Sequence, residues 1–407
     1  MPEKKPGKIY RSQAEAVVKA LEGVFVEGRY ADKIIEYILR QDRRRGSSDR
    51  AFIADTVYGV VRYKRLYQEI TGVERINGPH ACWRLMAAHV VVSGGTLPPW
   101  EEFSKISPEK IISAYQKCRK VRKVRESIPD WLDRMGMDEL PDVWDAEISA
   151  LNTQAPVVLR VNTLKTDMAS LRRALAGNGI VGKDVPGCPD ALELVTRKNV
   201  FDTDAFRAGM FEVQDASSQK VAALLDPRPG MRVVDACAGA GGKTLHISAL
   251  MEGKGTITAM DIFSGKLEEL KKRARRAGAS NITPKVIEGS KTIKRMKESA
   301  DRLLLDVPCS GLGVLRRNPD AKWKLTPEFV DSVTQTQAEI LSSYSAMLKP
   351  GGRMVYSTCS VLPRENGMQV ARFLTENSGY KLLEEHSLLA SRDGYDGFYM
   401  ALIERGQ

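Results

Sequence analysis

The carboxyl-terminal half of the chain alternates short apolar segments with amphipathic ones, and this alternation limits the possible folds more than any other feature. The apolar segments with the length and composition of buried strands are 232–236, 255–261, 302–308 and 352–360. Helical patterns lie between them, as at 264–278 and after Thr326, which is placed to cap a helix that Pro327 begins. Such alternation predicts a parallel sheet covered by helices on both faces. We therefore expect a doubly wound α/β domain over residues 226–407.

Two regions with different patterns precede this domain. Residues 1–125 carry apolar side chains at helical spacing, which predicts a helical domain. Residues 126–225 contain strand-like segments at 157–162 and 191–195 and one amphipathic helical segment at 166–180. This mixture predicts a small α+β domain between the two larger ones.

The charge balance indicates the kind of partner. The 407 residues include 62 Lys and Arg against 51 Asp and Glu, a formal charge of +11. An excess of this size favours polyanions, because each neutralised phosphate releases condensed counterions. The charge therefore favours a polyanionic partner, of which a nucleic acid is one kind.

Other classes are disfavoured by the same composition. No apolar run reaches the roughly 18 residues of a membrane span, and no apolar segment follows the basic amino terminus, so we expect neither membrane association nor a secretory signal. Six cysteines in 407 residues without a CxxC pair argue against a disulfide scaffold and against a metal site. We expect a cytoplasmic monomer.

A glycine-rich segment, DACAGAGGKT (235–244), follows the first strand of the α/β domain. A dinucleotide motif that starts at Gly239 would need glycine where Thr244 stands, and a phosphate-binding loop would need glycine where Cys237 stands. Asp261 at the end of the next strand is placed to accept hydrogen bonds from ribose hydroxyls, or alternatively to cap the following helix. The pattern predicts an adenosine-containing cofactor.

Two cysteines follow buried strands into loops at the edge of the sheet where ligands bind. They are Cys309, in LLLDVPCSGLG, and Cys359, in VYSTCSV. A thiolate at such a position can act as a nucleophile if nearby cations lower its pKa. Cys237 lies in the glycine loop, where a packing or backbone role is expected.

Four segments together resemble the Nop/Sun RNA cytosine-5 methyltransferases, particularly the RsmB-like branch that acts on ribosomal RNA. They are FEVQDASSQ (211–219), DACAGAGGKT (235–244), LLLDVPCSGLGVLRRNPDAKW (303–323) and YSTCS (356–360). Residues 11–125 resemble, more weakly, the NusB-type helical domain of that branch. The resemblance implies a Rossmann-like class I methyltransferase domain, an RRM-like subdomain that binds RNA, S-adenosylmethionine as cofactor and 16S ribosomal RNA as substrate.

The same resemblance implies roles for individual residues. Cys359 would add to carbon 6 of cytosine and activate carbon 5, and Cys309 would assist release of the product. Asp306 would hold the base and Lys243 would lie near it. The reverse assignment, with Cys309 as nucleophile, remains open because DNA cytosine methyltransferases use the cysteine of a Pro-Cys pair.

The cofactor and RNA sites follow from the same motifs. The residues that the resemblance assigns to the cofactor are Cys237, Ala238, Gly239, Ala240, Gly241, Gly242, Lys243, Asp261, Glu288 and Asp306. Glu288 departs from the Asp-Gly pair usual there. The residues expected to contact RNA are Arg316, Arg317, Lys322 and Trp323, the last being alternatively a packed aromatic. A tRNA substrate, or a non-catalytic ribosome-assembly factor that binds RNA, remains an alternative.

Overall fold

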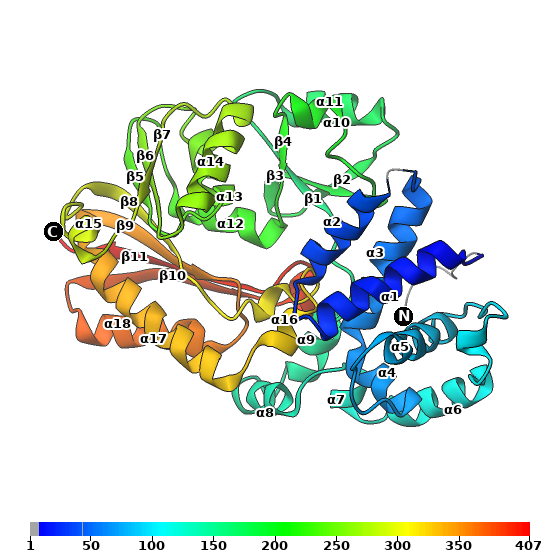
Figure 1. The fold of residues 1–407 in the computed structure, drawn as a ribbon. Helices are drawn as coiled ribbons and strands as arrows, with labels where there is room; N and C mark the ends of the chain where they lie inside the picture. Colours follow the sequence, from blue (N-terminus) through cyan, green and yellow to red (C-terminus); the bar gives the residue numbers. More distant parts are fainter. Residues whose placement is uncertain (1–7, 43) are drawn as a thin grey trace. The chain divides into compact units, whose positions relative to one another are not determined.

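The computed structural model describes residues 8–42 and 44–407, and the chain divides into two compact units (Figure 1). One unit comprises the chain up to Asn152 together with Leu315–Leu325. The other comprises Thr153–Val314 and Thr326–Gln407. The chain therefore leaves the second unit shortly after Cys309 and returns to it at Thr326.

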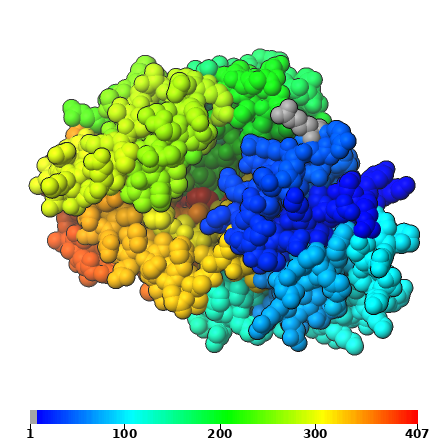
Figure 2. Space-filling model, in the orientation of Figure 1, coloured from blue at the N-terminus to red at the C-terminus, as the bar shows by residue number. Residues whose placement is uncertain are grey.

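The first unit is helical throughout its described residues, and its blue and cyan atoms appear in Figure 2. Its helices bury a continuous apolar core that includes Leu21, Val57 and Met86. The α-helices are α1 (Arg11–Phe25), α2 (Ala31–Gln41), α3 (Ser47–Arg62), α4 (Lys64–Thr71), α5 (Pro79–Val92), α6 (Pro108–Cys118), α7 (Arg122–Arg125), α8 (Asp130–Glu139), α9 (Trp144–Leu151) and α16 (Ala321–Lys324).

Helices α8 and α9 group with this unit, although the sequence pattern placed a domain boundary at residue 125. Trp144 on α9 is buried, and its Nε1 donates to Asp133 Oδ1 at 3.1 Å. The same carboxylate accepts from Arg122 Nε at 2.9 Å. A shared carboxylate thus ties α7, α8 and α9 together.

The second unit begins with a four-stranded antiparallel sheet in the order β2-β3-β1-β4. Its elements follow the βαββαβ sequence of a ferredoxin-like fold. They are β1 (Val158–Val161), α10 (Met168–Ala176), β2 (Gly182–Val185), β3 (Cys188–Leu194), α11 (Asp204–Arg207) and β4 (Phe211–Val213). The pattern at 126–225 predicted β1, β3 and α10 but not the remaining elements.

The larger part of this unit is a seven-stranded sheet in the order β10-β11-β9-β8-β5-β6-β7 (Figure 1). Its strands are β5 (Arg232–Asp235), β6 (Thr256–Asp261), β7 (Ile282–Val286), β8 (Ala300–Asp306), β9 (Leu348–Thr358), β10 (Tyr380–Leu388) and β11 (Phe398–Arg405). The helices are α12 (Ala216–Leu225), α13 (Gly242–Leu250), α14 (Ser264–Ala277), α15 (Ser290–Lys294), α17 (Pro327–Tyr344), α18 (Gly367–Glu376) and α19 (Ala390–Asp393). The predicted doubly wound α/β fold is confirmed.

The predicted parallel arrangement does not extend to one edge of the sheet. Strand β11 pairs antiparallel with both β9 and β10, whereas β5 to β9 are mutually parallel. The short connection 389–397 returns the chain directly after β10 and places β11 between that strand and β9. Parallel neighbours need a crossover connection of roughly a dozen residues or more, so this shorter connection produces an antiparallel pair.

Alternate residues of the central strands pack against helices on opposite faces. Leu304 joins the core with α12 and α13, whereas Leu303 and Leu305 join the core with α17 and α18. Each fully buried aliphatic side chain contributes roughly 1.5–3 kcal/mol. Burial on both faces therefore makes β5, β8 and β9 a rigid base for the loops at their ends. No helix in residues 8–42 and 44–407 has the length and apolarity to cross a membrane.

Candidate active site

The candidate site lies at the carboxyl ends of β5, β6, β8 and β9. From β5 the chain order runs outward through β6 and β7 on one side, and through β8 and β9 on the other. Ligands of open α/β sheets bind at such a switch point, because the loops diverge there and leave a crevice. All the predicted catalytic residues lie in or directly after these elements.

The two candidate cysteines meet because their strands are neighbours in register. Asp306 on β8 is paired with Ser357 on β9, so the loops that follow these strands begin at the same level. The Sγ atoms of Cys309 and Cys359 lie 3.2 Å apart, and both side chains are half-buried. Each thiol is therefore within reach of the other and of a molecule in the crevice.

A half-buried ion pair stands beside the cysteines. Lys243 Nζ, on the first turn of α13, donates to Asp306 Oδ2 at 2.6 Å, and Ser357 Oγ donates to Asp306 Oδ1 at 2.8 Å. The side chains of Lys243 and Asp306 keep 12% and 27% of their exposure, which leaves both accessible from the crevice. The pair joins the glycine-loop helix to the strand that precedes Cys309.

The charges around the thiols distinguish the two cysteines. The pKa of Cys309 is raised well above its usual value by its hydrogen bond with Cys359, by burial and by the nearby Glu365 carboxylate. Burial acts to lower the pKa of Lys243, but Asp306 first, and then Cys359 and Asp235, raise it on balance. A thiolate at Cys359 would thus face the Lys243 ammonium and accept a hydrogen bond from the Cys309 thiol.

The glycine loop between β5 and α13 is shaped to approach a ligand closely. Gly239 and Gly241 have φ values of +55° and +87°, which favour glycine, and a Cβ on Gly241 would lie 2.6 Å from Leu270 Cγ. Cβ atoms built on Gly239 and Gly242 would meet open space. The open side of this loop is therefore a cradle that side chains at these positions would fill.

Asp261 fastens the glycine loop to the end of β6. Its Oδ2 accepts from Gly239 N at 2.9 Å and its Oδ1 accepts from Phe263 N at 2.8 Å. Each carboxylate oxygen keeps a lone pair for a further donor. Burial and the surrounding carboxylates raise the pKa of Cys237 well above its usual value, so that this thiol stays protonated in the loop.

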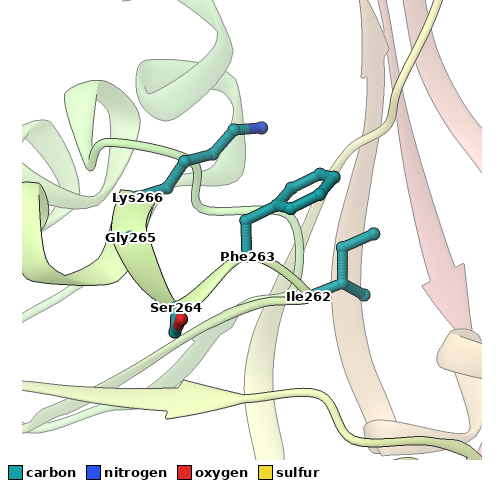
Figure 3. Close-up of a pocket in the computed structure, with 5 residues that line it drawn as sticks. All are labelled: Ile262, Phe263, Ser264, Gly265 and Lys266. Atoms are coloured by element: carbon teal, nitrogen blue, oxygen red, sulfur yellow. The ribbon is translucent and has the colours of Figure 1, made fainter.

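A shallow pocket adjoins Asp261 on the side chains of the β6–α14 turn (Figure 3). Ile262 and Phe263 project to the same side of this turn and are 60% and 56% exposed. Lys266 Nζ lies 4.7 Å from the centroid of the Phe263 ring. Exposed apolar side chains beside a strand-end carboxylate offer a surface for a planar base. Glu288 is exposed in the loop after β7, the neighbouring strand.

Residues of the small antiparallel sheet hold the backbone of the glycine loop through hydrogen bonds and ion pairs. Arg160 on β1 is 1% exposed and donates from Nη1 to Gly242 O at 2.8 Å. Arg273 on α14 donates to Ala240 O and to Glu212 Oε2, both at 2.9 Å. Glu212 lies on β4 and also pairs with Arg276. Two arginines thus hold carbonyl groups of the loop that the sequence assigned to the cofactor.

The structure contradicts the RNA-contact prediction for Lys322. Its side chain is buried in the helical unit, where Nζ donates to Asn152 Oδ1 at 2.9 Å and to Glu126 O at 3.2 Å. Trp323 is half-buried and donates from Nε1 to Val61 O at 2.7 Å, as the packed-aromatic alternative supposed. A buried ammonium cannot reach a phosphate, so Lys322 serves the packing of this unit.

Arg316 and Arg317 are half-buried in the same segment. Arg62 Nη2 donates to Arg316 O at 2.9 Å. The backbone at Arg316 is therefore held by α3.

Several supporting residues were missed by reasoning from the sequence. They are Ser357, Arg160, Glu212, Arg273 and Glu365. Most of their partners lie far along the chain, so the local sequence gives no sign of these contacts. The sequence did carry a local signal for the surface beside Asp261. Two large apolar residues, Ile262 and Phe263, directly follow this strand-end acid.

Comparison with known proteins identifies similar sequences for most of the chain. Residues 222–403 match the family described as 16S rRNA methyltransferase RsmB/F, and residues 128–201 match the ferredoxin-like domain of RsmF/B-like methyltransferases. The probable ribosomal RNA small subunit methyltransferase B of Synechocystis is 38% identical over 264 residues, which cover 63% of this chain and 58% of that protein. The Pasteurella multocida ribosomal RNA small subunit methyltransferase B is 35% identical, with coverages of 68% and 65%. The matched part thus spans less than two thirds of these relatives.

Solved structures share the architecture. The crystal structure of PH0851 superposes with a TM-score of 0.83 and 24% identity over 99% of this chain and 100% of that chain, which shows the fold. A methyltransferase homolog from Pyrococcus horikoshii gives a TM-score of 0.63 and 26% identity over 70% of this chain and 97% of its own. With its ferredoxin-like and methyltransferase domains both matched, the chain belongs to the RsmB/F methyltransferase family.

Proposed function

We propose that this chain transfers a methyl group from S-adenosylmethionine to carbon 5 of a cytidine in 16S ribosomal RNA through a covalent adduct with Cys359. The observation that carries the proposal is the pair of thiols 3.2 Å apart beside the Lys243–Asp306 ion pair, at the switch point of the sheet. The choice of ribosomal RNA rests on the names of the relatives, and the formal charge of +11 suits any RNA.

The cofactor residues fit such a group. The open cradle at Gly239 and Gly242 and the free lone pairs of Asp261 supply close backbone approach and acceptors for ribose hydroxyls. Ile262 and Phe263 would cover the adenine, with Glu288 nearby. S-adenosylmethionine, when bound, supplies a methyl group on a sulfonium centre that an electron-rich carbon can attack.

The chain's own residues would make carbon 5 electron-rich. Cys359, which lies near the Lys243 ammonium, would add as a thiolate to carbon 6 of the base. Asp306, fixed by Lys243 and Ser357, would orient the amino edge of the ring. Once carbon 5 has gained the methyl group, its proton would pass to Cys309 as that thiol gives its own proton to the departing Cys359 thiolate. The Cys359–carbon 6 bond would then break and restore the double bond between carbons 5 and 6.

The Cys309 thiol is suited to this second role. Its raised pKa keeps the proton on its sulfur at neutral pH, so that it can donate to a departing thiolate at Cys359. The opposite assignment would require a thiolate at Cys309, next to the Glu365 carboxylate. The local charges therefore support Cys359 as the nucleophile.

The test is methyl transfer from radiolabelled S-adenosylmethionine to RNA from a strain that lacks this protein, followed by nucleoside analysis. The proposal expects label in 5-methylcytidine of small-subunit RNA. Label confined to tRNA would contradict the ribosomal substrate. Absence of label from intact ribosomal RNA, tRNA and immature small subunits would contradict catalysis and favour a non-catalytic RNA-binding factor, provided that the protein binds the cofactor.

A further inference from the structure

A buried carboxylate joins the two loops that carry the cysteines. Glu365 lies in the 3₁₀ turn Pro363–Glu365 after β9 and is 0% exposed. Its Oε2 accepts from Ser310 N at 2.7 Å, and its Oε1 accepts from the hydroxyls of Ser310 and Ser360, each at 2.5 Å. These serines directly follow Cys309 and Cys359.

Further hydrogen bonds fix Glu365 through its side chain and its backbone. Gln337 on α17 donates from Nε2 to Glu365 Oε2 at 3.0 Å and to Pro308 O at 2.9 Å. Tyr356 Oη donates to Glu365 O at 2.6 Å. Glu365 is thus held by neutral donors from the β8 loop, from α17 and from β9, and a charge so placed is costly unless its bonds are kept.

The side chain of the next residue, Asn366, forms hydrogen bonds with the residues on either side of Cys359. Asn366 accepts from Thr358 Oγ1 at 2.5 Å through Oδ1 and donates from Nδ2 to Ser360 O at 3.0 Å. Cys359 is therefore bracketed by Asn366, whereas the link between the two cysteine loops passes through Glu365.

We propose that Glu365 positions the two cysteine loops against each other, so that Cys359 is presented as the attacking thiol and Cys309 as its partner. This inference rests on the proposed function. The carboxylate of Glu365 acts on the thiols through Ser310 and Ser360, so Glu365 is a positioning residue. Its negative charge also raises the pKa of Cys309.

We call Glu365 and its bonds to Ser310 and Ser360 the clamp, and each of the two serines one arm of it. Loss of either arm should have its own effect on the reaction. The Ser360 arm holds the nucleophile, so Ser360→Ala should slow formation of the covalent RNA adduct. The Ser310 arm holds the releasing thiol, so Ser310→Ala should form the adduct but resolve it slowly. Glu365→Gln, which exchanges one acceptor oxygen for a donor, should impair both steps, roughly tenfold or more for adduct formation, because small displacements of reacting groups are costly.

The experiment uses the full chain in three parallel measurements. Adduct formation and decay are followed with RNA, thermal unfolding reports stability, and brief treatment with iodoacetamide followed by peptide mass spectrometry gives the alkylation ratio of Cys359 to Cys309. Only thiolates react rapidly with this reagent. Ser345→Ala is the matched control, since Ser345 is also buried and its Oγ donates to Ser342 O outside the site.

The expected result is preferential alkylation of Cys359 in the parent chain, loss of that preference in Glu365→Gln, and opposite kinetic defects in the two serine variants. Unchanged alkylation ratios, or adduct defects in both serine variants that merely follow the loss of thermal stability, would overturn the proposal. If Glu365→Gln does not fold, the serine variants decide. A parent chain that forms no adduct would refute the proposed function, while the alkylation ratio would still test the clamp.

Discussion

The Sγ atoms of Cys309 and Cys359 lie 3.2 Å apart although 50 residues separate them in sequence. Their proximity follows from the parallel pairing of β8 and β9, in which Asp306 faces Ser357. Strand register thus places two thiols, a carboxylate and a hydroxyl at one point of the sheet edge. Lys243 reaches the same point from the glycine loop, so the proposed catalytic and cofactor sites would share a charged group.

The Lys243–Asp306 pair should be required for the reaction rather than for folding. Asp306→Asn keeps the side-chain size but weakens the bond from Lys243, and we expect methyl transfer to fall by roughly 10²-fold or more, as is typical when a charged catalytic contact is removed. Thermal unfolding should change little, because the pair keeps contact with solvent. Steady-state methylation of RNA measures the effect. Activity within twofold of the parent chain would contradict the role of Asp306.

Arg273 should matter for cofactor affinity, and Arg276 supplies a matched control. Both lie on α14, both side chains are 21% exposed, and both pair with Glu212, but Arg273 also holds Ala240 O. Loss of one charge-assisted bond to the loop costs about 1.5–3 kcal/mol, so Arg273→Met should weaken S-adenosylmethionine binding roughly tenfold or more. Arg276→Met should not weaken it. Titration calorimetry would show equal affinities for the two variants if Arg273 has no influence on the loop.

Lys322 should contribute to stability and not to RNA binding. Lys322→Met leaves Asn152 Oδ1 without this donor, at a cost of about 1–3 kcal/mol, whereas Glu126 O keeps its bond from Asn152 Nδ2. Filter binding at fixed salt should give the same RNA affinity for the variant and the parent chain at a temperature where both are folded. A clear loss of affinity in the folded variant would restore the sequence-based prediction.

His246 on α13 should make stability depend on pH. Burial, with Arg160 nearby, lowers the pKa of its imidazole to about 4 from an ordinary value near 6.5. Between about pH 6.5 and pH 4 the His246 imidazole is therefore protonated in the unfolded chain but neutral in the folded chain. The stability that the neutral ring contributes is complete above pH 6.5 and is lost as the pH falls toward 4, by up to about 3 kcal/mol.

Urea unfolding of the parent chain and of His246→Asn at pH 7 and pH 4.5 isolates this contribution, since other groups titrate equally in both. The free energy of unfolding of the variant, relative to that of the parent chain, should rise as the pH falls. Parallel losses of stability in the two proteins would show that His246 does not titrate as described.

The sequence was most informative where the chemistry is local. Apolar runs and turn residues predicted β5, β6, β8 and β9, and the motif segments identified the loops at their ends. The antiparallel edge was not predictable, because the exposed, weakly apolar β10 carries little strand signal. The burial of Lys322 was equally hidden, since a lysine in a basic segment gives no sign that a helical unit encloses it. The role of Glu365 could not be predicted either, because it depends on contacts with serines from two separate loops.

The most direct test of the account is the covalent complex formed with substrate RNA by single-cysteine variants, resolved on a denaturing gel. Cys309→Ala should accumulate a stable RNA–protein adduct because release is impaired, and Cys359→Ala should form none. An adduct that survives in Cys359→Ala and disappears in Cys309→Ala would reverse the roles of the two thiols and contradict the central claim.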